Sequence, residues 1–151
     1  MWYRVFCRGE SRLPPAEILE FLHTHGIPAT GNFRGDDLGW TGAEFSYGVG
    51  SPVYVERFLA KEDSLRDDLN SWAAFLETCD YSPNHEMLME RVIQSKQMLT
   101  LRKPIDHADE ISLDKLCLMI CRHFAEQADG IYQVDDDGWY DANSGMLLKE
   151  Y

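Results

Sequence analysis

Long apolar runs are scarce in this chain. The longest runs from Leu116 to Cys121 and ends at Arg122, far short of the roughly 18 consecutive apolar residues that mark a membrane-spanning helix. The first eight residues also lack the extended apolar region and the small-residue cleavage site of a secretory signal. These absences predict a cytoplasmic protein that does not enter a membrane.

Cysteine is sparse and irregularly spaced. Cys7, Cys79, Cys117 and Cys121 show no dense disulfide pattern, and a chain of 151 residues buries a core without cross-links. Cys117 and Cys121 share one helix face, but further ligands at zinc spacing are missing and His123 points elsewhere on the helix. We therefore predict reduced, mostly buried thiols, with no metal and no cofactor.

Basic residues are outnumbered. The chain has 14 lysines and arginines against 26 aspartates and glutamates, and its formal net charge is −12. Such a chain repels a phosphate backbone, which argues against nucleic-acid binding. Apolar residues still make up 44% of the sequence, enough for a folded core. A protein with a basic surface is the partner that this charge favours.

Catalytic motifs are missing as well. There is no Gly-x-Ser-x-Gly nucleophile elbow. The glycines of 48–51 lack the lysine of a P-loop and the third glycine of a dinucleotide fingerprint, and His85-Glu86 lacks the second histidine of a zinc protease. The acidic segment 135–145 offers oxygen ligands without EF-hand spacing. We identify no catalytic residue, and the chain favours a protein that is not an enzyme.

Apolar periodicity divides the chain into strands and helices. Strands are predicted at 2–8, 29–34, 40–47, 53–59, 97–102, 131–134, 139–141 and 146–149. Helices are predicted to begin at Pro14-Pro15, near Ser64, after an Asn84 cap and after a Ser112 cap. The pattern predicts an α+β fold over 1–151, a single domain whose antiparallel-rich sheet or sheets pack with about four helices.

An acidic turn recurs in the two halves of the chain. Residues 36–40 match residues 135–139 at four of five positions, and each copy follows a predicted strand–helix pair. Halves 1–80 and 81–151 therefore both predict a β-α-β-β unit, which a duplicated, ferredoxin-like arrangement would explain. The alternative explanation is two unrelated hairpin turns, because Asp, Gly and an aromatic residue are common in turns.

One face of the predicted sheet is aromatic. If Tyr3 and Val5 face the helices, the opposite face carries Trp2, Arg4, Phe6, Arg8, Tyr54 and Phe58. Such a face is too apolar to be left in water. The second half of the chain, a second copy in a homodimer or a ligand could cover it, and we favour cover from within the chain. The bases of single-stranded RNA also stack on aromatic sheet faces in some proteins, but the net negative charge of this chain argues against RNA binding.

Two classes of function remain. The first is a small acidic, non-catalytic interaction or regulatory protein that binds another protein. Its predicted partner surface consists of Asp36, Asp37, Asp135, Asp136, Asp137, Trp2, Arg4, Phe6, Tyr54 and Phe58. The alternative is a small-molecule-binding protein or an enzyme with a pocket between the two halves, where His107, Glu44 and Arg57 would converge. The missing motifs favour the first class.

Overall fold

The computed structural model describes residues 1–36, 39–61 and 63–151. Over these residues the chain forms eight strands and four helices. The strands are β1 (Trp2–Cys7), β2 (Thr30–Asp36), β3 (Gly39–Ser46), β4 (Val53–Leu59), β5 (Gln97–Arg102), β6 (Gly130–Val134), β7 (Gly138–Tyr140) and β8 (Met146–Lys149). The helices are α1 (Pro15–Thr24), α2 (Asp63–Glu77), α3 (His85–Ile93) and α4 (Glu110–Gln127).

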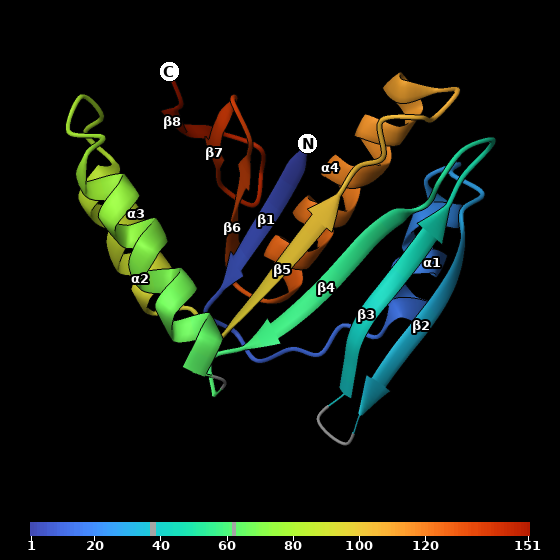
Figure 1. Ribbon diagram of the computed structural model, residues 1–151, viewed down its shortest axis with the longest axis horizontal. Helices are drawn as coiled ribbons and strands as arrows, with labels where there is room; N and C mark the ends of the chain where they lie inside the picture. The colour runs from blue at the N-terminus through green and yellow to red at the C-terminus, as the bar shows by residue number, and fades with distance from the viewer. Residues whose placement is uncertain (37–38, 62) are drawn as a thin grey trace.

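All eight strands belong to one sheet, in the order β2-β3-β4-β5-β1-β6-β7-β8. Every neighbouring pair is antiparallel. Strands β1 and β5 lie in the middle, although they come from opposite halves of the chain (Figure 1). The predicted α+β class, with an antiparallel sheet and four helices, is confirmed.

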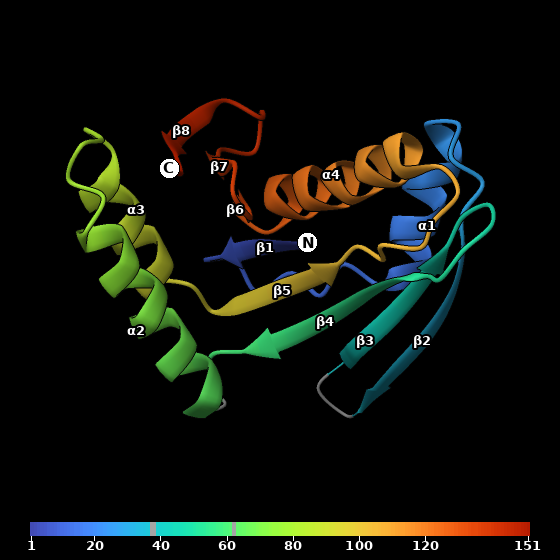
Figure 2. The same cartoon turned by 45° about the horizontal axis from the view of Figure 1, so that its top comes forward.

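Helices α1 and α4 cover one face of the sheet (Figure 2). Alternate residues of β1, Tyr3, Val5 and Cys7, are fully buried there with Leu99 and Leu101 of β5, because side chains of period two share a face of a strand. The apolar stripe of α4 packs onto them, as its helical spacing predicts.

Helices α2 and α3 pack against each other and cover the other face at one end of the sheet. They bury Phe6, Met98, Ile131 and Trp139. In Figures 1 and 2, no helix of the described chain lies over β2, β3 and β4 on this side. This uncovered area, together with the adjoining exposed side chains of Trp2 in β1 and Arg102 in β5, is called the open face below. No helix within the described residues has the length and apolar character needed to cross a bilayer.

The helix starts differ in detail from the sequence predictions. Helix α1 begins at Pro15 as predicted, and Gly26, with a φ of +81°, follows its end. The predicted Ser112 cap of α4 is wrong: Asp109 is the cap, and its Oδ1 accepts a hydrogen bond from the backbone N–H of Ser112 at 3.1 Å. Asn84 does precede α3, but its side chain donates to the carbonyl of Leu147 at 2.7 Å instead of capping.

All four cysteines are free and buried. Cys117 and Cys121 lie in the apolar stripe of α4, where the sequence places them. Burial raises the pKa of the Cys117 thiol to about 12 and also raises the pKa of Cys7. The thiols of Cys7 and Cys117 therefore stay protonated, and they act as small apolar side chains of the core.

Candidate functional site

The strand register aligns one row of side chains across the open face. Trp2 of β1, Arg102 of β5, Tyr54 of β4, Glu44 of β3 and Asn32 of β2 are successive cross-strand partners. The guanidinium carbon of Arg102 lies 4.7 Å from the ring centroid of Tyr54 and 5.9 Å from that of Trp2. Trp2 remains 38% exposed. This part of the predicted aromatic face therefore lies open to solvent, with an arginine between two rings.

A second row runs parallel to the first. It contains Arg4, Thr100, Glu56 and Gly42, and Gly42 pairs in turn with Arg34 of β2. The guanidinium of Arg34 lies directly over Gly42, because a Cβ built on that glycine would come within 2.5 Å of the guanidinium carbon. The open face thus carries both signs of charge, and a glycine makes room for one arginine.

The third row is covered by the chain itself. Phe6, Met98 and Phe58 are cross-strand partners, and the Phe6 ring stacks on Trp139 with centroids 5.3 Å apart. Trp72 of α2 meets the same Phe6 ring edge-on at 6.2 Å. The cover comes from α2 and α3, so it involves both halves of the chain and not the second half alone.

Arg4 joins the covered row to the acidic turn after β6. Its guanidinium carbon lies 4.6 Å from the ring centroid of Trp72. Its Nη1 donates to Oε1 of Gln133 at 2.8 Å and to Oδ1 of Asp135 at 2.6 Å. The arginine that the sequence places on the aromatic face is therefore bound by a ring, an amide and a carboxylate.

A cavity of about 450 Å³ opens beside this arginine, between α2 and the sheet. Its lining includes Trp72, Phe75, Gln133, Asp135, Asp136 and Glu150, and it is called the acidic cavity. Gln133 donates from Nε2 to Oε1 of Glu150 at 2.8 Å and to Oδ1 of Asp135 at 3.2 Å. Burial raises the pKa of the Glu150 carboxyl, and the carboxylates of Asp135 and Asp136 act in the same direction. The cavity combines aromatic walls with crowded negative charge.

The predicted acidic turns do not form one patch. Asp137 accepts a hydrogen bond from the hydroxyl of Tyr140 at 2.9 Å, which acts together with burial to raise the pKa of Tyr140 to about 12. Asp36 ends β2, at the opposite edge of the sheet from the acidic cavity. Asp37 lies outside the described residues.

The three residues of the predicted pocket occupy three different settings. Glu44 belongs to the first row of the open face. The Nε2 of His107 contacts the carbonyl of Tyr47, and its Nδ1 accepts from the backbone N–H of Asp109 at 3.0 Å, so both ring nitrogens hold loop backbone. Arg57 is buried at the end of β4 and lines a different cavity.

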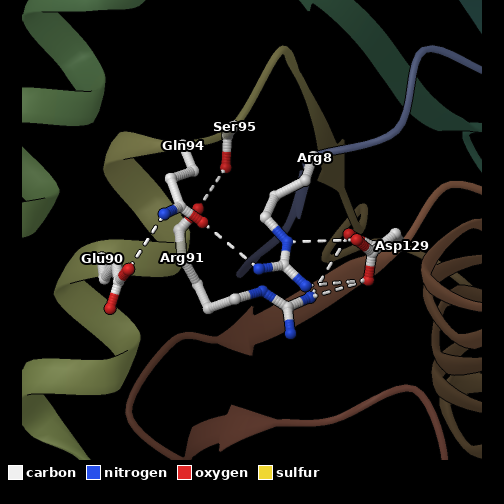
Figure 3. A network of polar contacts seen from close by, with 6 residues as sticks. All are labelled: Arg8, Glu90, Arg91, Gln94, Ser95 and Asp129. Carbon is white, nitrogen blue, oxygen red and sulfur yellow. Dashed lines mark hydrogen bonds and ion pairs between the residues drawn. The ribbon is translucent and has the colours of Figure 1, made fainter.

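Arg8, which the sequence places on the aromatic face, instead belongs to a polar network at the edge of α3 (Figure 3). Arg8 donates from Nε to Oδ2 of Asp129 at 3.1 Å, and Arg91 donates from Nη2 to the Asp129 carbonyl at 3.2 Å. Gln94 accepts from Nη1 of Arg8 at 3.2 Å. Two arginines thus share one carboxylate, which links β1 and α3 to the turn before β6.

Within the described residues, no group of three or more histidine, cysteine, aspartate or glutamate side chains is arranged to hold a metal ion. Comparison with protein-family models, curated proteins and solved structures finds no match to this chain. The functional argument therefore rests on the geometry of the acidic cavity and the open face.

Proposed function

We propose that this protein is a non-catalytic interaction protein whose acidic cavity binds an arginine or lysine side chain of a partner protein. The observation that carries this proposal is the cavity itself, about 450 Å³ in volume, with two aromatic rings and three carboxylates in its lining. A long cationic side chain packs its carbon stem on apolar surface while its charged end meets carboxylates. The net charge of −12 attracts a basic partner at long range.

The bound Arg4 supports this assignment, because it shows how the same wall accommodates a guanidinium. Arg4 lies over Trp72 and pairs with Asp135. Its single charge is set against the three carboxylates of Asp135, Asp136 and Glu150. Burial among like charges raises the pKa of Glu150. A second cation from a partner would offset that repulsion.

The proposal is tested with a short arginine-rich peptide as the probe. Binding is measured by calorimetry and by the NMR shift of the Trp72 indole N–H. The double variant Asp136→Asn, Glu150→Gln should bind about three- to ten-fold more weakly, since each exposed charge pair contributes about 0.2–1 kcal/mol.

The control is Glu17→Gln, Glu20→Gln, which removes two exposed carboxylates from α1, on the opposite face of the sheet from the acidic cavity. Its affinity should stay within about two-fold of the unaltered protein, because distant exposed charges are screened by salt. No shift of the Trp72 indole, or equal losses in both double variants, would show that the cavity is not the binding site.

We also propose a ferredoxin-like framework for the sheet. In the central order β4-β5-β1-β6, β1 and β4 flank β5 while β5 and β6 flank β1, and the helices α1 and α4 lie on the same face. This interleaving of two crossovers is typical of a β-α-β-β-α-β unit. Each half contributes one crossover, which is consistent with a duplication. The hairpins β2–β3 and β7–β8 extend the unit at its two edges.

We retain the cytoplasm as the proposed compartment. Its support is the set of four free, buried cysteines, since proteins of oxidising compartments commonly pair their cysteines.

A further inference from the structure

A second cavity of about 450 Å³ lies where the loop after β1 passes the ends of β4 and β5. Its polar lining consists of Glu10, Arg12, Arg57, Lys61, Lys96 and Gln97, and Leu59 and Ala60 add apolar surface. Four of these lining residues are basic and one is acidic. In a chain whose net charge is −12, basic residues therefore outnumber acidic ones around this cavity. We call it the cationic cavity.

Arg57 is the buried member of the cationic cavity, with 7% of its surface exposed. Its Nε donates to Oε1 of Gln97 at 2.9 Å, and its Nη1 donates to the carbonyl of Trp40 at 3.1 Å. Burial lowers the pKa of Arg57, the nearby Arg12 lowers it further, and Asp36 acts in the opposite direction. The guanidinium is therefore held in place through its Nε and Nη1 groups.

The loop that brings Arg12 to the cavity is also held. Nε2 of Gln97 donates to the carbonyls of Gly9 and Ser11, both at 2.8 Å. The indole Nε1 of Trp40 donates to the carbonyl of Arg12 at 2.7 Å. The amide oxygen of Gln97 thus accepts a hydrogen bond from Arg57, and its amide nitrogen donates both hydrogens to the loop. Side-chain hydrogen bonds from the sheet fix the backbone around Arg12.

The two arginines converge above Gly39. A Cβ built on this glycine would lie 3.4 Å from Nη1 of Arg57 and 3.6 Å from Cδ of Arg12. Gly39 has a φ of +111°, a conformation that residues with a side chain rarely adopt. A Cβ would touch both arginines at ordinary contact distances, so the backbone conformation, and not the space, favours glycine at this position.

The network of Figure 3 is another place in this protein where two arginine side chains converge. There, Arg8 and Arg91 meet on the carboxylate of Asp129. In the cationic cavity, by contrast, Arg12 and Arg57 converge together with Lys61 and Lys96, while Glu10 of the lining and Asp36, which acts on the charge of Arg57, supply negative charge. An anionic ligand would add to this negative charge and offset repulsion between the cations.

We infer that the cationic cavity binds a small organic phosphate. The phosphate oxygens accept hydrogen bonds from Arg12 and Arg57, since the guanidinium fork matches tetrahedral oxyanions. Lys61 and Lys96 add charge at the rim, and Leu59 contacts the carbon part of the ligand. A phosphate presents three terminal oxygens on one atom to both guanidinium groups, whereas the two charges of malonate lie on separate planar carboxylates. The volume of about 450 Å³ is in the range of small-molecule sites.

The test uses inorganic phosphate, phenyl phosphate and malonate as probes, each compared with sodium chloride at the same ionic strength. Binding is measured by calorimetry and by the rise of the thermal midpoint, because a ligand of the folded state stabilises it by mass action. Phenyl phosphate should bind more tightly than inorganic phosphate, since its ring contacts Leu59 and Ala60. Malonate should bind more weakly than either.

Two variants locate the site. Arg12→Gln, at an exposed position, should weaken phenyl phosphate about ten-fold or more, as expected for a charge-assisted hydrogen bond. Lys115→Gln removes an equally exposed cation from α4 and should leave the affinity unchanged. The variant Lys96→Gln is a second reporter that leaves the buried network of Arg57 and Gln97 intact.

Three results would overturn the inference: no stabilisation beyond that of sodium chloride, tighter binding of malonate than of phosphate, or equal losses in Arg12→Gln and Lys115→Gln. None of these variants touches the acidic cavity, and the probes are anions. Failure here is therefore distinguishable from failure of the proposed protein-binding function.

Discussion

The guanidinium of Arg4 lies over the indole of Trp72, with its carbon 4.6 Å from the ring centroid. This contact joins β1, in the middle of the sheet, to α2, which covers one end of it. Arg4 also pairs with Asp135 at 2.6 Å, and the Arg4 side chain is only 18% exposed. A charge in this position contributes to stability and contacts Trp72 and Asp135, which line the acidic cavity.

Replacement of Arg4 by Gln should therefore destabilise the fold. We expect a loss of about 1–2 kcal/mol in the free energy of unfolding, because one cation–π contact and one partly buried ion pair disappear together. Urea denaturation measures this loss. Arg102→Gln is the matched control, since Arg102 lies between two rings on the exposed open face and should cost about 0.5 kcal/mol or less. Equal losses in the two variants would contradict a structural role for the Arg4–Trp72 contact.

Leu116 and Ile111 give a test of the α4 assignment. Leu116 is fully buried in the apolar stripe of α4, whereas Ile111 on the same helix is 86% exposed. Leu116→Asp should unfold the domain, because an unpaired charge in the core costs several kcal/mol. Ile111→Asp should leave the thermal midpoint nearly unchanged. Circular dichroism during heating checks both, and a stable Leu116→Asp protein would mean that this face of α4 is not in the core.

Asp129 offers a prediction that separates charge from backbone geometry. Its carboxylate binds Arg8 and Arg91, and its φ is +51°. Asn tolerates this left-handed conformation, so Asp129→Asn should cost only about 1 kcal/mol or less for the exposed ion pairs. Asp129→Ala should cost about 1–2 kcal/mol more, for the strained backbone. Urea denaturation of both variants gives the difference directly, and equal stabilities would show that the backbone contributes nothing.

Local patterns predicted the elements of this fold well. The alternation in 2–8 and the helical spacing of 113–124 placed β1 and α4 on the correct faces, because burial on one face follows from strand and helix periodicity. The α4 cap was missed since Asp109 and Ser112 are both good cap residues. Strand order was beyond the sequence, because the pairing of β1 with β5 joins residues almost a hundred positions apart.

The acidic cavity was likewise predictable from the sequence only in part. The composition of the turn identified Asp135 and Asp136 as candidate binding residues. It did not identify Gln133, which lies within β6, or Glu150, which follows β8. Helical spacing from Leu69 predicts Trp72 or Ala73 in the apolar stripe of this helix, and only the position of α2 on the sheet makes Trp72 a cavity wall. No local signal links positions 72, 133 and 150, because the cavity forms only when α2 packs against the sheet, which is built from both halves of the chain.

Glu150 provides the final prediction, which concerns pH. Burial and the nearby carboxylates of Asp135 and Asp136 raise the pKa of Glu150 in the folded protein. A carboxyl whose pKa is higher in the folded state favours the fold below its unfolded pKa, and that stability is lost as the pH rises through the folded pKa. Glu150→Gln should therefore raise the thermal midpoint at neutral pH, because the amide oxygen still accepts from Gln133 while the repelling charge is gone.

The gain from Glu150→Gln should shrink as the pH falls through the raised pKa of Glu150, where the native carboxyl becomes neutral as well. Thermal midpoints of both proteins between about pH 4 and pH 8 measure this, the range being set by the ordinary glutamate value of about 4.3. Glu110→Gln, on an exposed carboxylate of the first turn of α4, is the control and should not stabilise the fold. A gain that stays constant with pH would mean that the charge of Glu150 is not its cause. A stabilised variant that also binds the arginine-rich peptide more weakly would mean that the carboxylate is retained for binding at the expense of stability.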